Sequence, residues 1–379
     1  MKLPKSLQYK LANRIATNAL RKLPVPRNLV DFATNDYLGF SKDVTVFQKS
    51  HQLLIDENLL VNGATGSRLL SGNHKLFGVT EEFIASFHQS DSALIYNSGY
   101  DVNVGFFSAV PQRNDVVLFD EFAHASIRDG ILMSKAKSFK FKHNDLDDLE
   151  KLLERFRTNH DEIYIVTESV FSMDGDSPDL MGLVHLSEKY KANLVIDEAH
   201  ALGVFGKSGE GLVQFLNLQS KVFARIMTFG KGLGCHGAAI LGSADLKNYL
   251  INFSRSFIYT TALSPHAVAT ILIAYQTLQS SNEKIKLLQE NSKYFNESLP
   301  SSLNVELFNS AIKSIVIPGN FVVKETAAFL QEKGFDVKPI LSPTVPEGKE
   351  RLRFCLHSYN TKKEITEVLG LLSEILKKF

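Results

Sequence analysis

The sequence contains no tryptophan, and only two of its 379 residues are cysteines, Cys235 and Cys355. They show no metal-ligand spacing and cannot form a disulfide framework, so we expect a reducing compartment, the cytoplasm. A membrane-spanning run is also lacking, because the most apolar stretch, TTALSPHAVATILIAY at 260–275, is short and includes a proline and a histidine. The net charge of +1 provides no overall field that would attract nucleic acid.

Acidic residues are missing from the first thirty positions, although lysines and arginines are frequent there. A basic, acid-free start is typical of mitochondrial transit peptides. Here serine is scarce and the segment DFATNDYLGF already begins at residue 31, so we interpret these residues as part of the folded protein. Leu7, Leu11, Ile15 and Leu20 recur about once per helical turn and predict a helix over 5–22.

Apolar runs alternate with helical segments through the middle of the chain. The runs are SALIYNSG (92–99), DVVLFDEFAH (115–124), EIYIVTESVFS (162–172), ANLVIDEAH (192–200), ARIMTFGKG (224–232) and GAAILGS (237–243). This alternation predicts an α/β fold with a mainly parallel central sheet and helices on both faces. After residue 266 the pattern becomes α+β. We therefore expect an N-terminal helix and arm at 1–45, a large domain at 46–265 and a smaller C-terminal domain at 266–379.

One lysine, Lys231, stands among closely spaced glycines in TFGKGLGCHGAAILGS (228–243), with no other charge near it. Ordering glycine costs more conformational entropy than ordering other residues. We therefore infer that another group approaches the backbone there and that the lysine amine has a chemical role. Ligands bind at the carboxyl ends of strands in such sheets. Polar residues follow the predicted strands at 120–124, 168–172, 197–200 and 228–231.

The segment VIDEAH, with Asp197 and His200, admits three interpretations. DEAH occurs in helicase ATPases, but these need a G-x-x-x-x-G-K-[ST] phosphate loop, and the position that requires its first glycine, 201, is an alanine. Asp197, His200 and His124 are metal ligands by type, but no His-x-x-x-His or cysteine pair supports them, so we expect no metal. The third interpretation is a carboxylate that faces a cationic ring nitrogen, with His200 beside the ring.

The third interpretation also explains Lys231. Pyridoxal phosphate needs an amine that forms a Schiff base and a carboxylate that keeps its pyridine nitrogen protonated. Its phosphate suits the amides and hydroxyls of a strand-to-helix turn. Each further candidate alone has a plainer explanation, as a helix cap, a satisfied polar residue or a strand threonine. Taken together and in order, they favour the cofactor: His124 on the ring face, and Ser98, Gly99, Tyr100, Thr228, Thr260 and Thr261 near the phosphate.

Seven segments resemble, in order, those of the α-oxoamine synthases, which are pyridoxal-phosphate enzymes of fold type I. They are NDYLGFS, GATGSRLLSGNH, SGYDVNVG, DEFAHASIRDG, TESVFSMDGD, VIDEAHALGVFG and TFGKGLGCHGAAILGS. The likeness runs from about residue 5 to 360 and is strongest to the biotin-pathway member. It implies that L-alanine loses its α-proton, attacks pimeloyl-CoA or a pimeloyl-carrier protein, and loses carbon dioxide to give an aminoketone. It also implies a homodimer with shared active sites.

The same resemblance implies a role for each residue that matches a family motif. Lys231 resembles the Schiff-base lysine and proton shuttle, Asp197 the pyridinium partner and His124 the stacking residue. His200 and Ser172 resemble the groups near the ring's phenolic oxygen; Gly99, Tyr100 and Thr228 match phosphate positions, and Thr260 or Thr261 matches one lent by the neighbouring subunit. The resemblance assigns the substrate carboxylate to Arg353, with Asn35 close by, and the biotin-pathway substrate to Arg21.

Several alternatives stay open within this resemblance. Glycine C-acetyltransferase-type and serine palmitoyltransferase-type activities use the same chemistry. The segment GATGSRLL contains fewer glycines than is common in the family, which leaves the acyl preference open. A non-catalytic family member would be expected to lack the lysine, and Lys231 is present.

Overall fold

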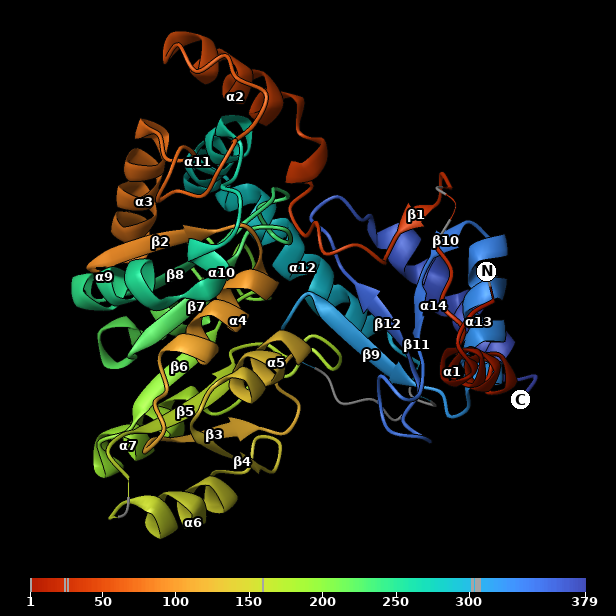
Figure 1. Cartoon of the computed structure of the whole chain (residues 1–379). Coiled ribbons are helices and arrows are strands. Elements are labelled where there is room, and N and C mark those ends of the chain that lie inside the picture. Colours follow the sequence, from red (N-terminus) through yellow and green to blue (C-terminus); the bar gives the residue numbers. More distant parts are fainter. Residues whose placement is uncertain (1, 24, 26, 159, 301–302, 304–307) are drawn as a thin grey trace. The chain divides into compact units, whose positions relative to one another are not determined.

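The computed structural model describes residues 2–23, 25, 27–158, 160–300, 303 and 308–379 (Figure 1). The chain forms two compact units. The larger unit comprises residues 35–172 and 176–288, and the smaller unit comprises 1–34, 173–175 and 289–379. The sequence suggested boundaries after residues 45 and 265, whereas the contacts within the structure group residues 35–45 and 266–288 with the larger unit.

The larger unit is built on a seven-stranded sheet with the order β2-β8-β7-β6-β5-β3-β4. The strands are β2 (Ser92–Tyr96), β3 (Val116–Asp120), β4 (Lys137–Phe141), β5 (Ile163–Glu168), β6 (Asn193–Asp197), β7 (Ala224–Thr228) and β8 (Ala238–Gly242). Pairing is parallel throughout except at β8, which runs antiparallel to both β2 and β7. The predicted α/β fold with a mainly parallel sheet is confirmed.

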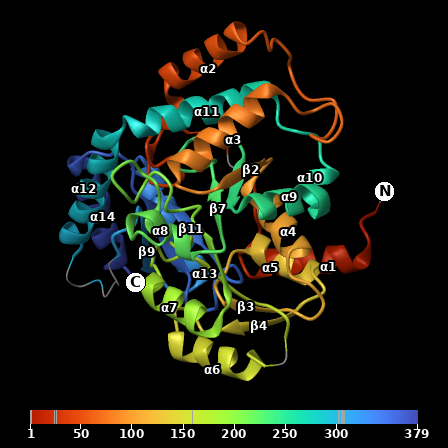
Figure 2. The same cartoon turned by 90° about the vertical axis from the view of Figure 1, so that its left-hand side faces the viewer.

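Helices surround this sheet and together cover both of its faces. They are α2 (Val44–Asp56), α3 (Lys75–Phe87), α4 (Gly99–Ala109), α5 (Ala125–Met133), α6 (Leu146–Phe156), α7 (Leu180–Tyr190), α8 (Leu212–Phe215), α9 (Ala244–Phe253), α10 (Arg255–Ile258) and α11 (Pro265–Gln279). Helix α12 (Asn282–Ser298) begins in this unit, and two short 3-10 helices lie at Phe40–Lys42 and Gln219–Lys221. Figure 2 shows α2, α3 and α11 grouped beside β2.

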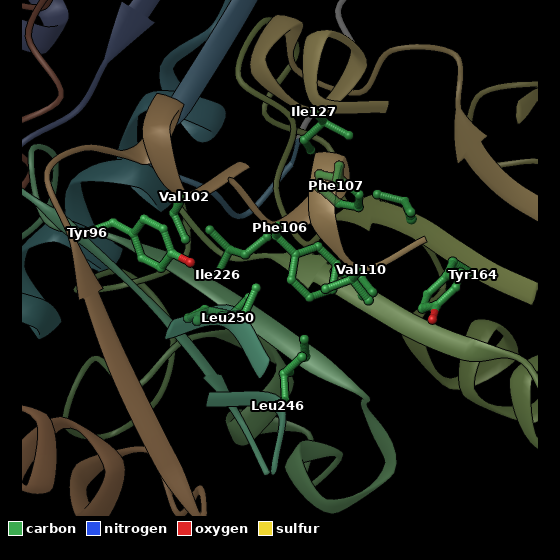
Figure 3. Close-up of a cluster of buried hydrophobic side chains, with 14 of the residues drawn as sticks. Tyr96, Val102, Phe106, Phe107, Val110, Ile127, Tyr164, Ile226, Leu246 and Leu250 are labelled. Atoms are coloured by element: carbon green, nitrogen blue, oxygen red, sulfur yellow. The ribbon is translucent and has the colours of Figure 1, made fainter. Parts of the chain in front are cut away.

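Two hydrophobic clusters show why consecutive strand residues are apolar. Val117 packs on one face with side chains of α4, α5, α9 and α10. Figure 3 shows part of this cluster, including Phe106 of α4 and Leu250 of α9. The strand neighbours of Val117, which are Val116 and Leu118, pack on the other face with side chains of α6, α7 and α8. Successive strand side chains point to opposite faces, so a strand buried on both sides must be apolar throughout.

Local sequence signals start several helices of the larger unit. The Ser98 side chain accepts a hydrogen bond from the Asp101 amide and caps α4. Asp145 caps α6 through the Asp148 amide, and Leu149, Leu153 and Phe156 bury one face of that helix. Strand β4 was not predicted, because its sequence KSFKF places lysines on an exposed edge and buries only Phe141.

The smaller unit contains an antiparallel sheet, as the α+β pattern predicted. Its strands β9 (Ile312–Val316), β11 (Lys338–Ile340) and β12 (Arg351–Cys355) have the order β11-β12-β9, and β1 (Val30–Asp31) pairs in parallel with β10 (Phe335–Asp336). Its helices are α1 (Lys5–Ala16), the second part of α12, α13 (Asn320–Glu332) and α14 (Lys362–Leu376). Thr361 and Glu364 form a reciprocal capping box at the start of α14.

Helix α1 is shorter than the sequence predicted. It ends at Ala16, where the Thr17 amide bonds to the Asn13 carbonyl and Asn18 adopts a φ of 52°. A left-handed residue stops the helix, so Arg21 lies beyond it and is not a helix charge. No residue of α1 is buried, so the regularly spaced apolar side chains that predicted the helix are not covered by the rest of this unit.

Candidate active site

The candidate site lies in the larger unit, where several strands end together. Glu168, Asp197 and Thr228 are the last residues of β5, β6 and β7, and Glu168 is the register partner of Asp197. Lys231 follows three residues after β7. The carboxyl ends of these strands meet at one edge of the sheet, so their polar side chains converge.

Glycines hold the turn that carries Lys231. A Cβ atom on Gly232 would lie 2.3 Å from the Leu202 carbonyl oxygen, and one on Gly234 would lie 2.2 Å from the Ser41 amide nitrogen. Gly234 also has a φ of +59°. Two other backbone segments therefore pack against this turn at distances that only glycine allows. The glycines that surround the lysine fix where its amine can lie.

The Lys231 amine is part of a short hydrogen-bonded chain. Its Nζ lies 2.8 Å from His200 Nε2. His200 Nδ1 lies 2.6 Å from the hydroxyl of Tyr37, which is fully buried. The Tyr37 hydroxyl also lies 3.3 Å from Asn35 Oδ1, so this predicted residue joins the same chain. Both nitrogens of His200 are thus engaged, which fixes the orientation of its ring.

Asp197 is held as a buried hydrogen-bond acceptor. Its Oδ2 accepts from the Asn103 side-chain amide at 2.9 Å, and its Oδ1 accepts from the Ala199 backbone amide at 2.9 Å. Only 5% of its surface is exposed. One donor thus holds each carboxylate oxygen, so the position of the Asp197 carboxylate is fixed.

His124 is held in one tautomer. The Ser126 backbone N–H donates to His124 Nδ1 at 3.2 Å, and the Ser126 hydroxyl lies 2.7 Å from the same nitrogen. Because a backbone N–H can only donate, Nδ1 is an acceptor and the ring proton sits on Nε2. Burial lowers the pKa of His124, the Asp197 charge raises it and the Lys231 charge lowers it, so the ring is neutral and close to both groups.

Glu168 is a buried acid that sequence reasoning left without a role. Its Oε1 accepts from the His124 backbone amide at 2.7 Å. Burial, assisted by the Asp197 charge and opposed by the Lys231 charge, raises the pKa of Glu168 to about 8. Its carboxyl group is therefore mostly protonated at neutral pH, and it fixes the backbone of His124 without adding a second full negative charge beside Asp197.

Small and hydroxylic residues gather at the start of α4. A Cβ atom on Gly99 would lie 2.5 Å from Thr228 Oγ1, so these positions are in direct contact. The Asn97 side-chain amide donates to Thr260 Oγ1 at 3.0 Å and to the Thr261 carbonyl at 2.7 Å. The structure therefore brings the 97–99 turn, Thr228 and the 260–261 segment together.

Other predicted residues lie at the margin of this arrangement or outside the larger unit. Tyr100 is half-exposed and its hydroxyl bonds to Asp129. Ser172 is half-buried and follows β5. Arg353 lies on β12, buried, and Arg21 donates to Thr344 Oγ1 at 3.2 Å; both belong to the smaller unit.

The described residues contain no cluster of three or more His, Cys, Asp or Glu that could hold a metal ion. Nor does any helix within the described ranges have the length and apolar character needed to cross a membrane.

The family model "Aminotransferase class I and II" matches residues 27–372. The chain belongs to this family. It is 39% identical to the 8-amino-7-oxononanoate synthase of Emericella nidulans over 98% of this chain and 96% of that one. This similarity confirms the resemblance to the α-oxoamine synthases.

Solved structures agree with the family assignment. The 8-amino-7-oxononanoate synthase of Francisella tularensis is 29% identical with a TM-score of 0.79, over 92% of this chain and 98% of that chain. The serine palmitoyltransferase of Sphingomonas wittichii is 26% identical with a TM-score of 0.91, over 100% of this chain and 99% of that chain. Serine palmitoyltransferase structures that contain pyridoxal phosphate, 24% identical to this chain, share its fold.

Four residues of this aminotransferase-family site were not singled out from the sequence. They are Tyr37, Asn103, Ser126 and Glu168, and each contacts a predicted site residue directly. All four lie within the segments that carry the resemblance: NDYLGFS, SGYDVNVG, DEFAHASIRDG and TESVFSMDGD. Only Glu168 ends a buried strand and so offered a signal in the sequence, because Tyr37 lies in a turn and Asn103 and Ser126 lie in α4 and α5.

Proposed function

We propose that this protein is a pyridoxal-phosphate-dependent 8-amino-7-oxononanoate synthase of biotin biosynthesis. It condenses L-alanine with a pimeloyl thioester and releases carbon dioxide and the free thiol of coenzyme A or a carrier protein. The observation that carries this proposal is the arrangement of Lys231, His200 and Asp197, with an amine 2.8 Å from an imidazole and a buried carboxylate beside them. The 39% identity to a synthase of this name over nearly the whole chain supports the same substrates.

The residues present fit pyridoxal phosphate. The contact between Gly99 and Thr228 leaves backbone amides and a hydroxyl accessible at the N-terminus of α4, where phosphate groups bind well. Asp197 provides a fixed negative charge for a ring nitrogen. His124 is a neutral aromatic ring able to lie against a cofactor face. When bound, the cofactor supplies an electron sink that stabilises negative charge at the α-carbon of the amino acid.

Specific residues would hold the cofactor. Lys231 would bind its aldehyde carbon through Nζ, and Asp197 would pair with its ring nitrogen. Further contacts would come from Ser172, His200, Ser98, Gly99, Tyr100, Thr228, Thr260 and Thr261. Asn97 holds the backbone of Thr261, which supports an anion site at this turn.

The chain's own residues would then move the protons. The Lys231 amine would take the α-proton of L-alanine and later return a proton to the product carbon. His200 Nε2, 2.8 Å from Nζ, can accept a proton from the amine, because its Nδ1 faces the Tyr37 hydroxyl. In the overall reaction a carbon–carbon bond forms at the thioester carbonyl, the carbon–sulfur bond breaks to release the thiol, and the alanine carboxylate leaves as carbon dioxide.

Arginines would recognise the substrates. Arg353, buried on β12, is suited to grip the alanine carboxylate through two parallel hydrogen bonds, with Asn35 beside the site. Such a grip would align the bond that breaks. Exposed Arg21 would contact the pimeloyl substrate. The neighbours named serine palmitoyltransferase support a second candidate, condensation of serine or glycine with another acyl thioester.

A homodimer is part of the proposal. The larger unit exposes a group of large apolar side chains on and after α2, which suits burial against a second copy. They are Val44, Phe47, Ile55, Leu60 and Val61. Sedimentation velocity of the wild type and Phe47→Glu tests this: we expect a dimer that dissociates more readily in the variant. We also propose a cytoplasmic location, since neither Cys235 nor Cys355 forms a disulfide bond.

The decisive experiment compares wild type and Lys231→Ala. We expect wild-type protein to be yellow, to keep the cofactor on a peptide containing Lys231 after borohydride reduction, and to release carbon dioxide with L-alanine and pimeloyl thioester. Lys231→Ala should lose the label and the activity, whereas Lys207→Ala, at an exposed lysine, should keep both. A panel of alanine, glycine and serine against several thioesters separates the alternatives. A colourless wild type that never takes up the cofactor would end the proposal.

A further inference from the structure

A half-buried histidine outside the predicted site lies between two buried carboxylates. His143 follows β4; its Nδ1 lies 2.9 Å from Asp120 Oδ1 and its Nε2 lies 2.7 Å from Asp176 Oδ2. The exposed fractions of the three side chains are 18%, 0% and 9%. Removing charged groups from water costs free energy, so we expect this cluster to have a role other than packing.

The hydrogen-bond pattern assigns the protons of His143. Asp120 also accepts from the Phe122 and Asn144 backbone amides, at 2.8 Å and 3.0 Å. Asp176 Oδ2 accepts from the Asn144 side-chain amide at 2.6 Å. Ionised carboxylates only accept, so both ring nitrogens of His143 must donate and the ring is an imidazolium. Burial opposes this charge, but the two aspartates raise the pKa of His143 to about 10.

The imidazolium connects two segments that carry proposed active-site residues. Phe122, two residues before His124, stacks on the His143 ring with centroids 4.3 Å apart. Phe171, directly before Ser172, meets the ring edge-on at 4.5 Å. The Phe171 amide also bonds to the Asp176 carbonyl at 3.0 Å. His143 therefore contacts both loops by ion pairs and by ring packing.

We propose that His143 is a positioning residue for the condensation: it ties the loop that carries His124 to the loop that carries Ser172 and keeps both side chains at the cofactor site. This inference rests on the proposed function. Neighbouring groups hold the cluster in place, because Asn144 bridges the same two aspartates and the His143 backbone amide bonds to Glu121 at 3.3 Å. Removing the charge would leave two buried carboxylates to repel each other and move the loops apart.

The first test does not depend on measuring enzyme activity. Histidine side-chain ¹⁵N NMR of the wild-type holoenzyme between pH 6 and 9 should show one ring that stays doubly protonated throughout. The signal is assigned by its absence in His143→Gln or, if that variant does not fold, by its shift in Asp176→Asn. A neutral ring at pH 7 would overturn the inference, whatever reaction the enzyme catalyses.

The second test distinguishes a role of His143 in positioning the two loops from a role only in stabilising the fold. We expect His143→Gln to retain the cofactor on Lys231 but to lose about 10- to 100-fold in kcat, with the KM for L-alanine changed by less than about threefold. The introduced glutamine side chain can donate to Asp120 and accept from an amide, so adding Asp176→Asn should restore most of the kcat. His185→Gln, at an exposed histidine, serves as the control. A folded His143→Gln variant with wild-type kcat and cofactor spectrum would refute the positioning role, whereas a wild type without cofactor would refute the proposed function instead.

Discussion

Nζ of Lys231 lies 2.8 Å from Nε2 of His200, and the other nitrogen of that ring lies 2.6 Å from the Tyr37 hydroxyl. The Tyr37 hydroxyl donates its single proton to Asn35 Oδ1 at 3.3 Å, so it accepts from His200 Nδ1, and Nε2 is the ring nitrogen that accepts from the lysine amine. The amine therefore has a proton acceptor within reach whose orientation is set by a fully buried residue.

Replacing Asp197 by asparagine should slow chemistry more than it weakens cofactor binding. The amide has a similar shape but no charge, so it cannot hold a proton on a ring nitrogen. We expect exchange of the L-alanine α-proton to fall by about 100-fold or more, measured by NMR in deuterium oxide. Asp161→Asn, at an exposed site, is the matched control. Exchange at the wild-type rate in Asp197→Asn would contradict the assigned role.

Replacing Gly99 by alanine should weaken cofactor binding. The added Cβ would lie 2.5 Å from Thr228 Oγ1, so the turn and the threonine must separate at the proposed phosphate site. We expect the dissociation constant for pyridoxal phosphate to rise by about tenfold or more, corresponding to about 1.4 kcal/mol. In Gly78→Ala, on α3, the new Cβ meets nothing within 4 Å, so this control should bind normally and be slightly more stable. Equal affinities in both variants would disprove the close contact.

The two arginines should affect different substrates. Arg353→Ala should raise the KM for L-alanine by about 10- to 100-fold while the protein stays yellow, because a bidentate carboxylate grip is lost. Arg21→Ala should instead raise the KM for the pimeloyl thioester. Steady-state kinetics with each substrate varied in turn distinguishes the two roles. Loss of the cofactor in Arg353→Ala would show that this arginine is misplaced in the proposal.

The charge on His143 should make its contribution to stability depend on pH. The folded pKa of about 10 lies above the ordinary value of 6.5. A raised pKa means that the stabilisation is fully present below about pH 6.5 and is lost as pH rises through 10. The difference in Tm between wild type and His143→Gln should therefore be largest near pH 6 and shrink towards pH 10, as measured by calorimetry. His185→Gln should show no such trend, and a constant difference for His143→Gln would argue against the buried charge.

Much of the fold was predictable because its signals are local. Strands buried on both faces read as continuous apolar runs, and the polar turn after each run marks its carboxyl end. Strand β4 was missed because an exposed edge strand that contains two lysines and buries only Phe141 resembles a solvated loop. The end of α1 was predicted at residue 22 instead of Ala16, because apolar spacing continues past Asn18 although the backbone turns left-handed there.

The sequence by itself determined the segments that form the candidate site, because a lysine among glycines and an acid after a buried strand are unusual enough to be informative alone. Only the tertiary structure decided which other side chains form hydrogen bonds with the site residues in these segments. Tyr37 reaches His200 across 163 residues, and Asn103 reaches Asp197 across 94. The physical reason is that hydrogen bonds act over about 3 Å in space, and a contact between distant positions leaves no periodicity in the chain.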